Sequence, residues 1–235
     1  MAAAAAPAAA MALETSAGPV TVSAVATGLE EPWAIAFLPD GGVMVTEREG
    51  RLLLLRDGAV AEVAGLPEVW AEGQGGLLDV MIPRDFAQSR EVWLSYAVAS
   101  GRGGATAVGK GRLSADGTRI EGFSTLWQGE GVRGGRHFGS RIVEGADGTV
   151  FVTTGDRGTG PDGLEAQDPM RPEGKVIRLN RDGSPAAAFA GHAPGVFSIG
   201  HRNAQGAALD GQGNLWLVEH GARGGDELNR IEGGR

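Results

Sequence analysis

The sequence predicts an all-β protein, a β-propeller built from four-stranded antiparallel blades. Glycine and proline are abundant, with 41 and 11 among 235 residues, and turn-forming residues at this frequency disfavour long helices. Short β-prone stretches alternate with Pro, Asp and Gly turns. The same turn-and-strand pattern recurs at a length that is typical of a propeller blade.

The first copy of this pattern is the clearest. Apolar stretches at 34–38, 43–47 and 51–56 are separated by short turns, of which the first reads Pro-Asp-Gly-Gly, and Asp57 and Gly58 close the unit. Strands joined by such tight turns form an antiparallel meander.

Later copies place the second strand of the unit at 92–96, 150–154 and 215–219. Anchors near 43, 92, 150 and 215 are therefore spaced by 49, 58 and 65 residues. A β-sandwich with meander segments is the alternative, but that fold gives no reason for a repeat of about this length. We predict propeller structure over 19–235.

Composition excludes several classes of function. The 29 acidic and 21 basic residues give a net charge of −8, which disfavours general binding to nucleic acid or anionic lipid. No stretch supplies the roughly 18 consecutive apolar residues of a membrane span. The absence of cysteine excludes disulfides, thiolate metal sites and a cysteine nucleophile.

Residues 1–18 form an Ala-rich leader. Its small residues, proline and repeated A-x-A sites are similar to the end of an export signal, although the basic start and Leu-rich core are missing. A disordered Ala-rich leader is the alternative. The export interpretation predicts a periplasmic or secreted protein.

Repeat-equivalent positions indicate a functional face. His137 and Arg202 each lie 13 residues before an anchor, and Asp156 and Gly221 each lie 6 residues after one. In a meander, the entry to strand one and the exit from strand two lie at the same end of the sheet. We therefore expect these four residues on one face, near the central channel.

Their chemistry points to a catalytic site. A carboxylate such as Asp156 beside His137 is the arrangement of a general base. Arg202 and Asn203 supply donors for a developing oxyanion or an anionic cofactor. Backbone carbonyls at 221–222 suit calcium. The acids Asp156, Asp162, Glu165 and Asp168 are better explained by a solvated insertion than by a second metal site.

These residues resemble the soluble quinoprotein glucose and aldose sugar dehydrogenases, six-bladed propellers that use pyrroloquinoline quinone (PQQ) with calcium. The resemblance runs from about Leu29 to the last residue. It is carried by PWAIAF at 32–37, GQGGLLD at 73–79, GRHFGSR at 135–141, TGDR at 154–157, QDP at 167–169, GKVIRL at 174–179, GHRNAQG at 200–206 and EHGARGGDELN at 219–229.

The resemblance implies three catalytic residues. His137 would take the proton from the anomeric hydroxyl of the sugar while a hydride passes to the quinone, and Asp156 would orient His137. Arg202 would polarise the reacting quinone oxygen, with Asn203 beside it.

The resemblance also implies binding residues. Gln74 would contact the substrate, together with the catalytic histidine. Gln205 and His220 would line the cofactor, and the carbonyls of Gly221 and Ala222 would ligate calcium. The electron acceptor is not identified.

The chain shows four repeats where the family has six blades. We therefore expect a fragment or truncated product, with about four of six blades and an exposed sheet edge through which it could self-associate.

Two other functions stay open at this point. One is a calcium-dependent lactone or ester hydrolase, which would hold its metal with carboxylates from several blades. The other is a non-catalytic propeller that binds a sugar or a protein.

Overall fold

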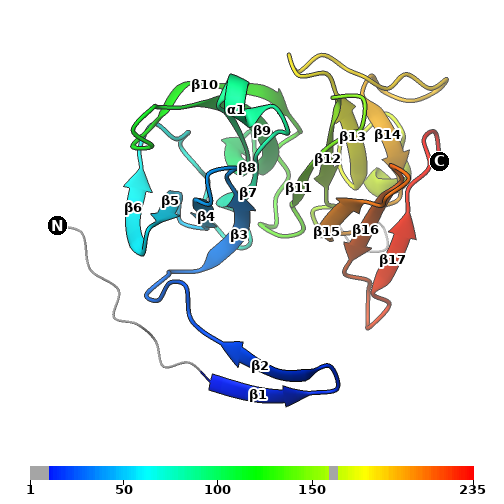
Figure 1. Ribbon diagram of the computed structural model, residues 1–235. Helices are drawn as coiled ribbons and strands as arrows, with labels where there is room; N and C mark the ends of the chain where they lie inside the picture. Colours follow the sequence, from blue (N-terminus) through cyan, green and yellow to red (C-terminus); the bar gives the residue numbers. More distant parts are fainter. Residues whose placement is uncertain (1–10, 159–163) are drawn as a thin grey trace.

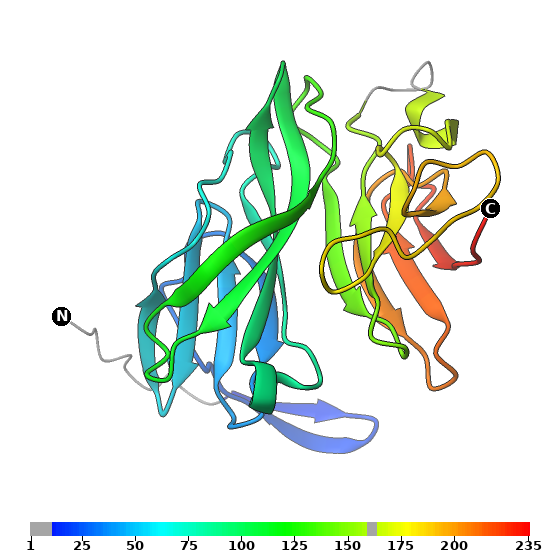
Figure 2. The same ribbon diagram turned by 90° about the horizontal axis from the view of Figure 1, so that it is seen from above.

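The computed structural model describes residues 11–158 and 164–235, and it confirms the propeller prediction. Four antiparallel sheets within these ranges lie side by side along an arc, each following the previous one in sequence (Figures 1 and 2). The first strands of neighbouring sheets contact one another, so they form the inner side of the arc. We call the sheets blades 1 to 4 in chain order.

Blades 1 and 2 each contain four strands. Blade 1 consists of β3 (Pro32–Phe37), β4 (Val43–Glu47), β5 (Arg51–Arg56) and β6 (Ala59–Val63). Blade 2 consists of β7 (Leu77–Met81), β8 (Glu91–Ser100), β9 (Gly103–Leu113) and β10 (Ile120–Gln128), with the short helix α1 (Phe86–Ser89) between β7 and β8.

Blade 3 also contains four strands, and blade 4 contains three within the described residues. Blade 3 consists of β11 (Gly139–Glu144), β12 (Val150–Thr154), β13 (Lys175–Leu179) and β14 (Val196–Ile199), with the 3-10 helix η1 (Leu164–Gln167) between β12 and β13. Blade 4 consists of β15 (Ala204–Leu209), β16 (Leu215–Glu219) and β17 (Glu227–Arg230).

All four anchors lie in the second strand of a blade, namely β4, β8, β12 and β16. In blades 1, 3 and 4 the turn before this strand has one structure. The carboxylates of Asp40, Asp147 and Asp210 each accept a hydrogen bond from the backbone N–H two residues further on, at 3.0, 3.1 and 2.9 Å. This side-chain turn directs the chain back along the first strand. Blade 2 departs from the pattern because α1 occupies the connection.

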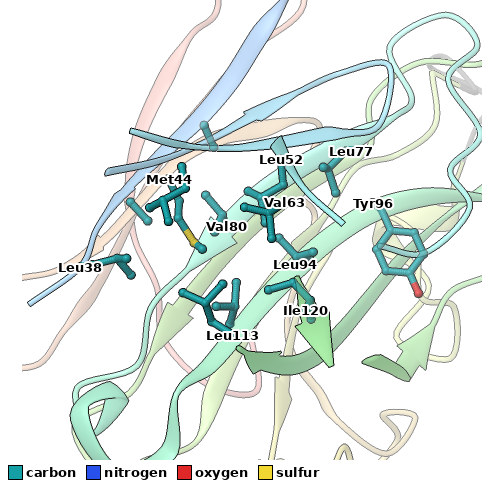
Figure 3. Close-up of a cluster of buried hydrophobic side chains, with 14 of the residues drawn as sticks. Leu38, Met44, Leu52, Val63, Leu77, Val80, Leu94, Tyr96, Leu113 and Ile120 are labelled. Atoms are coloured by element: carbon teal, nitrogen blue, oxygen red, sulfur yellow. The ribbon is translucent and has the colours of Figure 1, made fainter. Parts of the chain in front are cut away.

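The hydrophobic core lies between neighbouring blades. Figure 3 shows the cluster between blades 1 and 2, where Met44 and Leu52 meet Leu94 and Tyr96. Each of these side chains is almost completely buried. Burial of one such side chain contributes about 2 kcal/mol, so the blades stabilise one another face to face. Smaller clusters join blade 2 to blade 3 and blade 3 to blade 4.

A hairpin precedes the first blade. Strands β1 (Met11–Thr15) and β2 (Gly18–Val22) form a two-stranded sheet of their own, apart from the blades (Figure 1). The predicted boundary at residue 18 therefore falls at the turn of this hairpin. The first part of the predicted leader, 1–10, lies outside the described residues. The export signal stays a prediction.

The two end blades expose apolar side chains. Ile35 and Phe37 on β3 are 58% and 70% exposed, and Val218 and Leu228 on β16 and β17 are 54% and 67% exposed. These residues belong to blades 1 and 4, at the two ends of the arc. Self-association stays a prediction. No helix among the described residues is long and apolar enough to cross a membrane.

One side chain joins the inner strands of all four blades. Arg141 on β11 pairs with Asp79 on β7 at 3.0 Å and donates through Nε to the carbonyl oxygen of Gln205 on β15 at 2.6 Å. Its guanidinium also lies 4.3 Å from the ring centroid of Trp33 on β3. Burial raises the pKa of the Asp79 carboxyl, and Arg141 and the N–H of Ile142 offset only part of this rise.

We predict that Arg141→Met lowers the free energy of unfolding by about 3 kcal/mol, because it leaves the buried Asp79 carboxyl without its cation. The measurement is chemical denaturation. Arg112→Met is the matched control, since Arg112 is exposed and makes no ion pair in the described ranges. Equal stability of the two variants would contradict a central role for Arg141.

Candidate active site

The predicted functional residues gather at one end of blades 3 and 4. His137 precedes β11 and Asp156 follows β12, while Arg202 and Asn203 precede β15 and His220 follows β16. Because β11 and β15 each pair with the next strand in antiparallel register, these segments meet at the same end of their sheets. The offsets in the sequence thus correctly predicted a shared face.

His137 and Asp156 form the closest polar pair of the site. Nδ1 of His137 lies 2.6 Å from Oδ1 of Asp156, and the two side chains are 12% and 16% exposed. The N–H of Gly158 also donates to Oδ1 of Asp156 at 2.8 Å, so the carboxylate is held in place. With the proton on Nδ1 facing a carboxylate, Nε2 is the ring nitrogen that accepts a proton from a substrate.

The backbone of His137 is held in an uncommon conformation, with φ at 54°. Its N–H donates to Oε1 of Gln74 at 2.7 Å. A Cβ at Gly155 would lie 1.9 Å from the carbonyl oxygen of His137, so only glycine fits there. Gln74, which was predicted to contact substrate, therefore also fixes the position of the histidine.

A turn formed by Arg202 and Asn203 connects blade 4 to blade 3. The N–H of Asp156 donates to the carbonyl oxygen of Arg202 at 2.9 Å. Oδ1 of Asn203 accepts from the N–H of Gly139 at 3.2 Å and from Nε2 of Gln205 at 3.0 Å. Two residues predicted to bind the cofactor are thereby tied to the pair of His137 and Asp156.

Sequence reasoning missed the buried residues behind this turn. Oε2 of Glu219 accepts from the N–H of Arg202 at 2.7 Å, and Oε1 lies 3.0 Å from Nδ1 of His201. Burial by itself would raise the pKa of Glu219, but the hydrogen bonds from His201 and from the backbone outweigh it and hold this pKa below its usual range. A charged residue at the end of a buried strand was the available signal.

Two further arginines support the site and were also missed. Nη1 of Arg48 donates to the carbonyl oxygens of Ala71 and Gly75 at 2.9 and 3.1 Å, and so holds the loop that carries Gln74. The guanidinium of Arg157 lies 3.4 Å from the ring centroid of Phe138. Burial lowers the pKa of Arg157 to about 10, although nearby acidic groups oppose the shift.

Two adjoining hollows open beside these residues. The first has a volume of about 290 Å³ and is lined by Trp33, Gln74, Phe138, Asn203, Gln205 and His220, among others. The second has a volume of about 240 Å³ and is lined by Arg202, Glu219, His220, Gly221, Ala222 and Glu227, among others. His220 borders both hollows, and each residue predicted to bind the cofactor lines at least one of them, namely Arg202, Asn203, Gln205 and His220.

The loop after β16 presents the predicted calcium ligands. The N–H of Gly221 donates to Oδ1 of Asp226 at 3.1 Å, and the carbonyl oxygen of Ala222 accepts from the N–H of Gly225 at 3.2 Å. Side chains do not offer another metal site among the described residues, because no three His, Asp or Glu lie close enough together to hold a metal ion. Asp162 lies outside the described residues.

This arrangement supports proton abstraction next to a site for negative charge. The imidazole of His137 is oriented by a carboxylate on blade 3, and the next residue, Phe138, lines the first hollow. The guanidinium of Arg202 donates to the carbonyl oxygen of His220 at 2.9 Å, and Arg202 lines the second hollow from blade 4. A base and a cation so placed suit the oxidation of a hydroxyl group.

Comparison with known proteins agrees with this description. Residues 29–235 match the family model for glucose / sorbosone dehydrogenase. The chain is 42% identical over 227 residues to the aldose sugar dehydrogenase YliI of Escherichia coli (strain K12), which covers 92% of this chain and 60% of that protein. A solved glucose dehydrogenase superposes with a TM-score of 0.82 at 44% identity, over 88% of this chain and 63% of that chain.

The PQQ-bound form of an aldose sugar dehydrogenase from Streptomyces coelicolor superposes with a TM-score of 0.80 at 32% identity. That superposition covers 89% of this chain and 62% of the Streptomyces chain. The chain thus spans about 60% of the length of the curated relative from Escherichia coli. Since the family model matches nearly all of the sequence after the hairpin, this chain belongs to the glucose / sorbosone dehydrogenase family.

Proposed function

We propose that this chain acts in PQQ-dependent oxidation of aldose sugars at the anomeric hydroxyl, giving lactones. The observation that carries the proposal is the 2.6 Å contact between His137 Nδ1 and Asp156 Oδ1. This pair is hydrogen-bonded to Gln74, which lines the 290 Å³ hollow, and to the carbonyl oxygen of Arg202. Family membership supports the same chemistry. The substrate is an aldose, and the electrons pass to an acceptor that stays unidentified.

The pocket residues suit PQQ, a flat and polyanionic quinone. Trp33 and Phe138 provide aromatic surface in the 290 Å³ hollow, and Asn203 and Gln205 provide amide groups there. Arg202 lines the adjoining hollow and supplies a cation for a carboxylate or a quinone oxygen. When bound, PQQ would supply the acceptor for the hydride of the anomeric carbon.

Calcium would be held by backbone oxygens. Oxygen atoms are the ligands that calcium prefers, and the carbonyls of Gly221 and Ala222 are available in the loop that borders the pocket. The carbonyl oxygen of Ala222 accepts only a long hydrogen bond, at 3.2 Å from the backbone nitrogen of Gly225. This oxygen could therefore turn toward a cation at little cost.

His137 performs the proton transfer in this proposal. Its Nε2 takes the proton of the anomeric hydroxyl as the carbon is oxidised, and Asp156 stabilises the imidazolium that forms. Gln74 and Asp156 hold His137 in place from its backbone and from its ring.

We also propose that the protein is periplasmic or secreted, on the basis of the Ala-rich leader.

The two alternatives fit the site less well. A calcium-dependent hydrolase would need metal-binding carboxylates from several blades, and the described residues contain no such group. A purely sugar-binding propeller would have no need for a histidine oriented by a carboxylate.

We predict that His137→Ala reduces aldose-dependent dye reduction at least a hundredfold, because a general base contributes about 10² to 10⁴ in rate. Uptake of PQQ in the presence of calcium is expected to persist. Asp156→Asn should give a smaller loss, since the ring stays but its carboxylate is lost. His192→Ala is the control, because His192 lies in the loop between β13 and β14, with its ring against Phe189. Unimpaired oxidation by His137→Ala would show that another group is the base.

We predict that Arg202→Ala weakens PQQ binding about 10- to 100-fold, the value of one hydrogen bond to a charged group. Absorbance titration of the protein with PQQ and calcium measures the change. The control is Arg119→Ala, an exposed arginine on the connection between β9 and β10 at the other end of blade 2. A normal affinity in Arg202→Ala would remove this arginine from the cofactor site.

A further inference from the structure

A buried carboxylate lies next to the site. It belongs to Glu219, which lines the 240 Å³ hollow and not the 290 Å³ hollow. The side chain of Glu219, at the end of β16, is 3% exposed. Its Oε2 accepts from the N–H of Arg202 at 2.7 Å, and its Oε1 accepts from Nδ2 of Asn229 at 2.9 Å. His201 lies on the other side, with Nδ1 at 3.0 Å from Oε1.

His201 is fixed in turn by a second partner. Its Nε2 lies 2.9 Å from Oγ of Ser198, and its side chain is 6% exposed. With the Nδ1 proton of His201 directed at Glu219, Nε2 of His201 accepts a hydrogen bond from the hydroxyl group of Ser198. Ser198, His201 and Glu219 thus form a buried series of hydrogen bonds that ends at the backbone N–H of Arg202.

Both backbone groups of Arg202 are hydrogen-bonded, each to a different residue. The N–H of Arg202 is bound by Glu219, and its carbonyl oxygen is bound by the N–H of Asp156 at 2.9 Å. Asp156 itself holds His137. A displacement of Glu219 would therefore move Arg202 and reach the backbone of Asp156 through a single residue.

Blade 1 contains an equivalent residue that lacks these contacts. Glu47 ends β4 as Glu219 ends β16, and its side chain is also completely buried. Glu47 accepts from the N–H of Glu30 at 2.6 Å and pairs with Arg51 at 2.5 Å. A buried glutamate at this position is thus a structural feature of two blades, and only the one in blade 4 contacts Arg202.

We propose that Glu219 is a positioning residue, which holds Arg202 and Asn203 in the orientation that binds the anionic cofactor and couples them to Asp156. This inference rests on the proposed function for the identity of the cofactor. Its structural part, the control of Asp156 by Glu219, does not depend on that identity.

The test compares Glu219→Ala and Glu219→Gln with Glu47→Ala and Glu47→Gln. Two properties are measured in the whole chain: affinity for PQQ in the presence of calcium, per folded molecule, and hydrogen exchange of the Asp156 amide. Glutamine keeps one oxygen for the N–H of Arg202, and its amide can donate to His201 if the histidine proton moves to Nε2, which faces Ser198. Alanine keeps neither contact.

Glu219→Ala is expected to weaken PQQ binding at least tenfold and to accelerate exchange of the Asp156 amide. Glu219→Gln should stay within about threefold of the original affinity. Both Glu47 variants should melt at lower temperature yet keep the affinity and the Asp156 protection. The positioning role is overturned if Glu219→Ala matches Glu47→Ala in both measurements.

Failure of the proposed function is seen separately. If the unmodified chain takes up no PQQ, the cofactor assignment fails for this chain. Exchange of the Asp156 amide in the Glu219 and Glu47 variants then still decides whether Glu219 positions the turn.

Discussion

The pairing of Arg141 with Asp79 is the contact on which the arrangement of the blades depends most directly. Each blade is a local meander, and apolar burial between neighbours is non-directional. The hydrogen bonds of Arg141 to Asp79 and to the Gln205 carbonyl have defined geometry, and its stacking on Trp33 extends them to blade 1. They therefore set the inner strands in one relative position, and this position decides where the loops at their ends meet.

The site is the consequence of that alignment. No single blade contains it, because His137 and Asp156 come from blade 3, while Arg202 and the carbonyls proposed to bind calcium come from blade 4. Arg202 and Asn203 link the two halves through backbone groups. A hydrogen-bonded link of this kind fixes the two halves relative to each other, which the proposed proton and hydride transfer would require.

Backbone conformation also contributes to the site. His137 has a positive φ, a conformation that costs an ordinary residue about 1 kcal/mol or more. Gln74, Asp156 and the close approach of Gly155 hold it there. The strain is located at the residue that would accept the proton in the proposed reaction. Contacts of the folded chain offset this strain and so fix the orientation of the imidazole.

Much of this structure was predictable because a propeller repeats a local pattern. Alternating apolar stretches and Asp-Gly turns determine each meander, and repeat-equivalent offsets place His137, Asp156 and Arg202 at one end. The roles of Glu219, His201 and Arg48 were not predictable, because they depend on partners in other loops, although a charged residue at the end of a strand marked Glu219. The hairpin at 11–22 was not predicted, because it follows an Ala-rich segment and its first part was assigned to the leader. The sequence alone determined the blades and the candidate residues; the tertiary structure decided which of them touch, because contacts between blades depend on packing that no local pattern encodes.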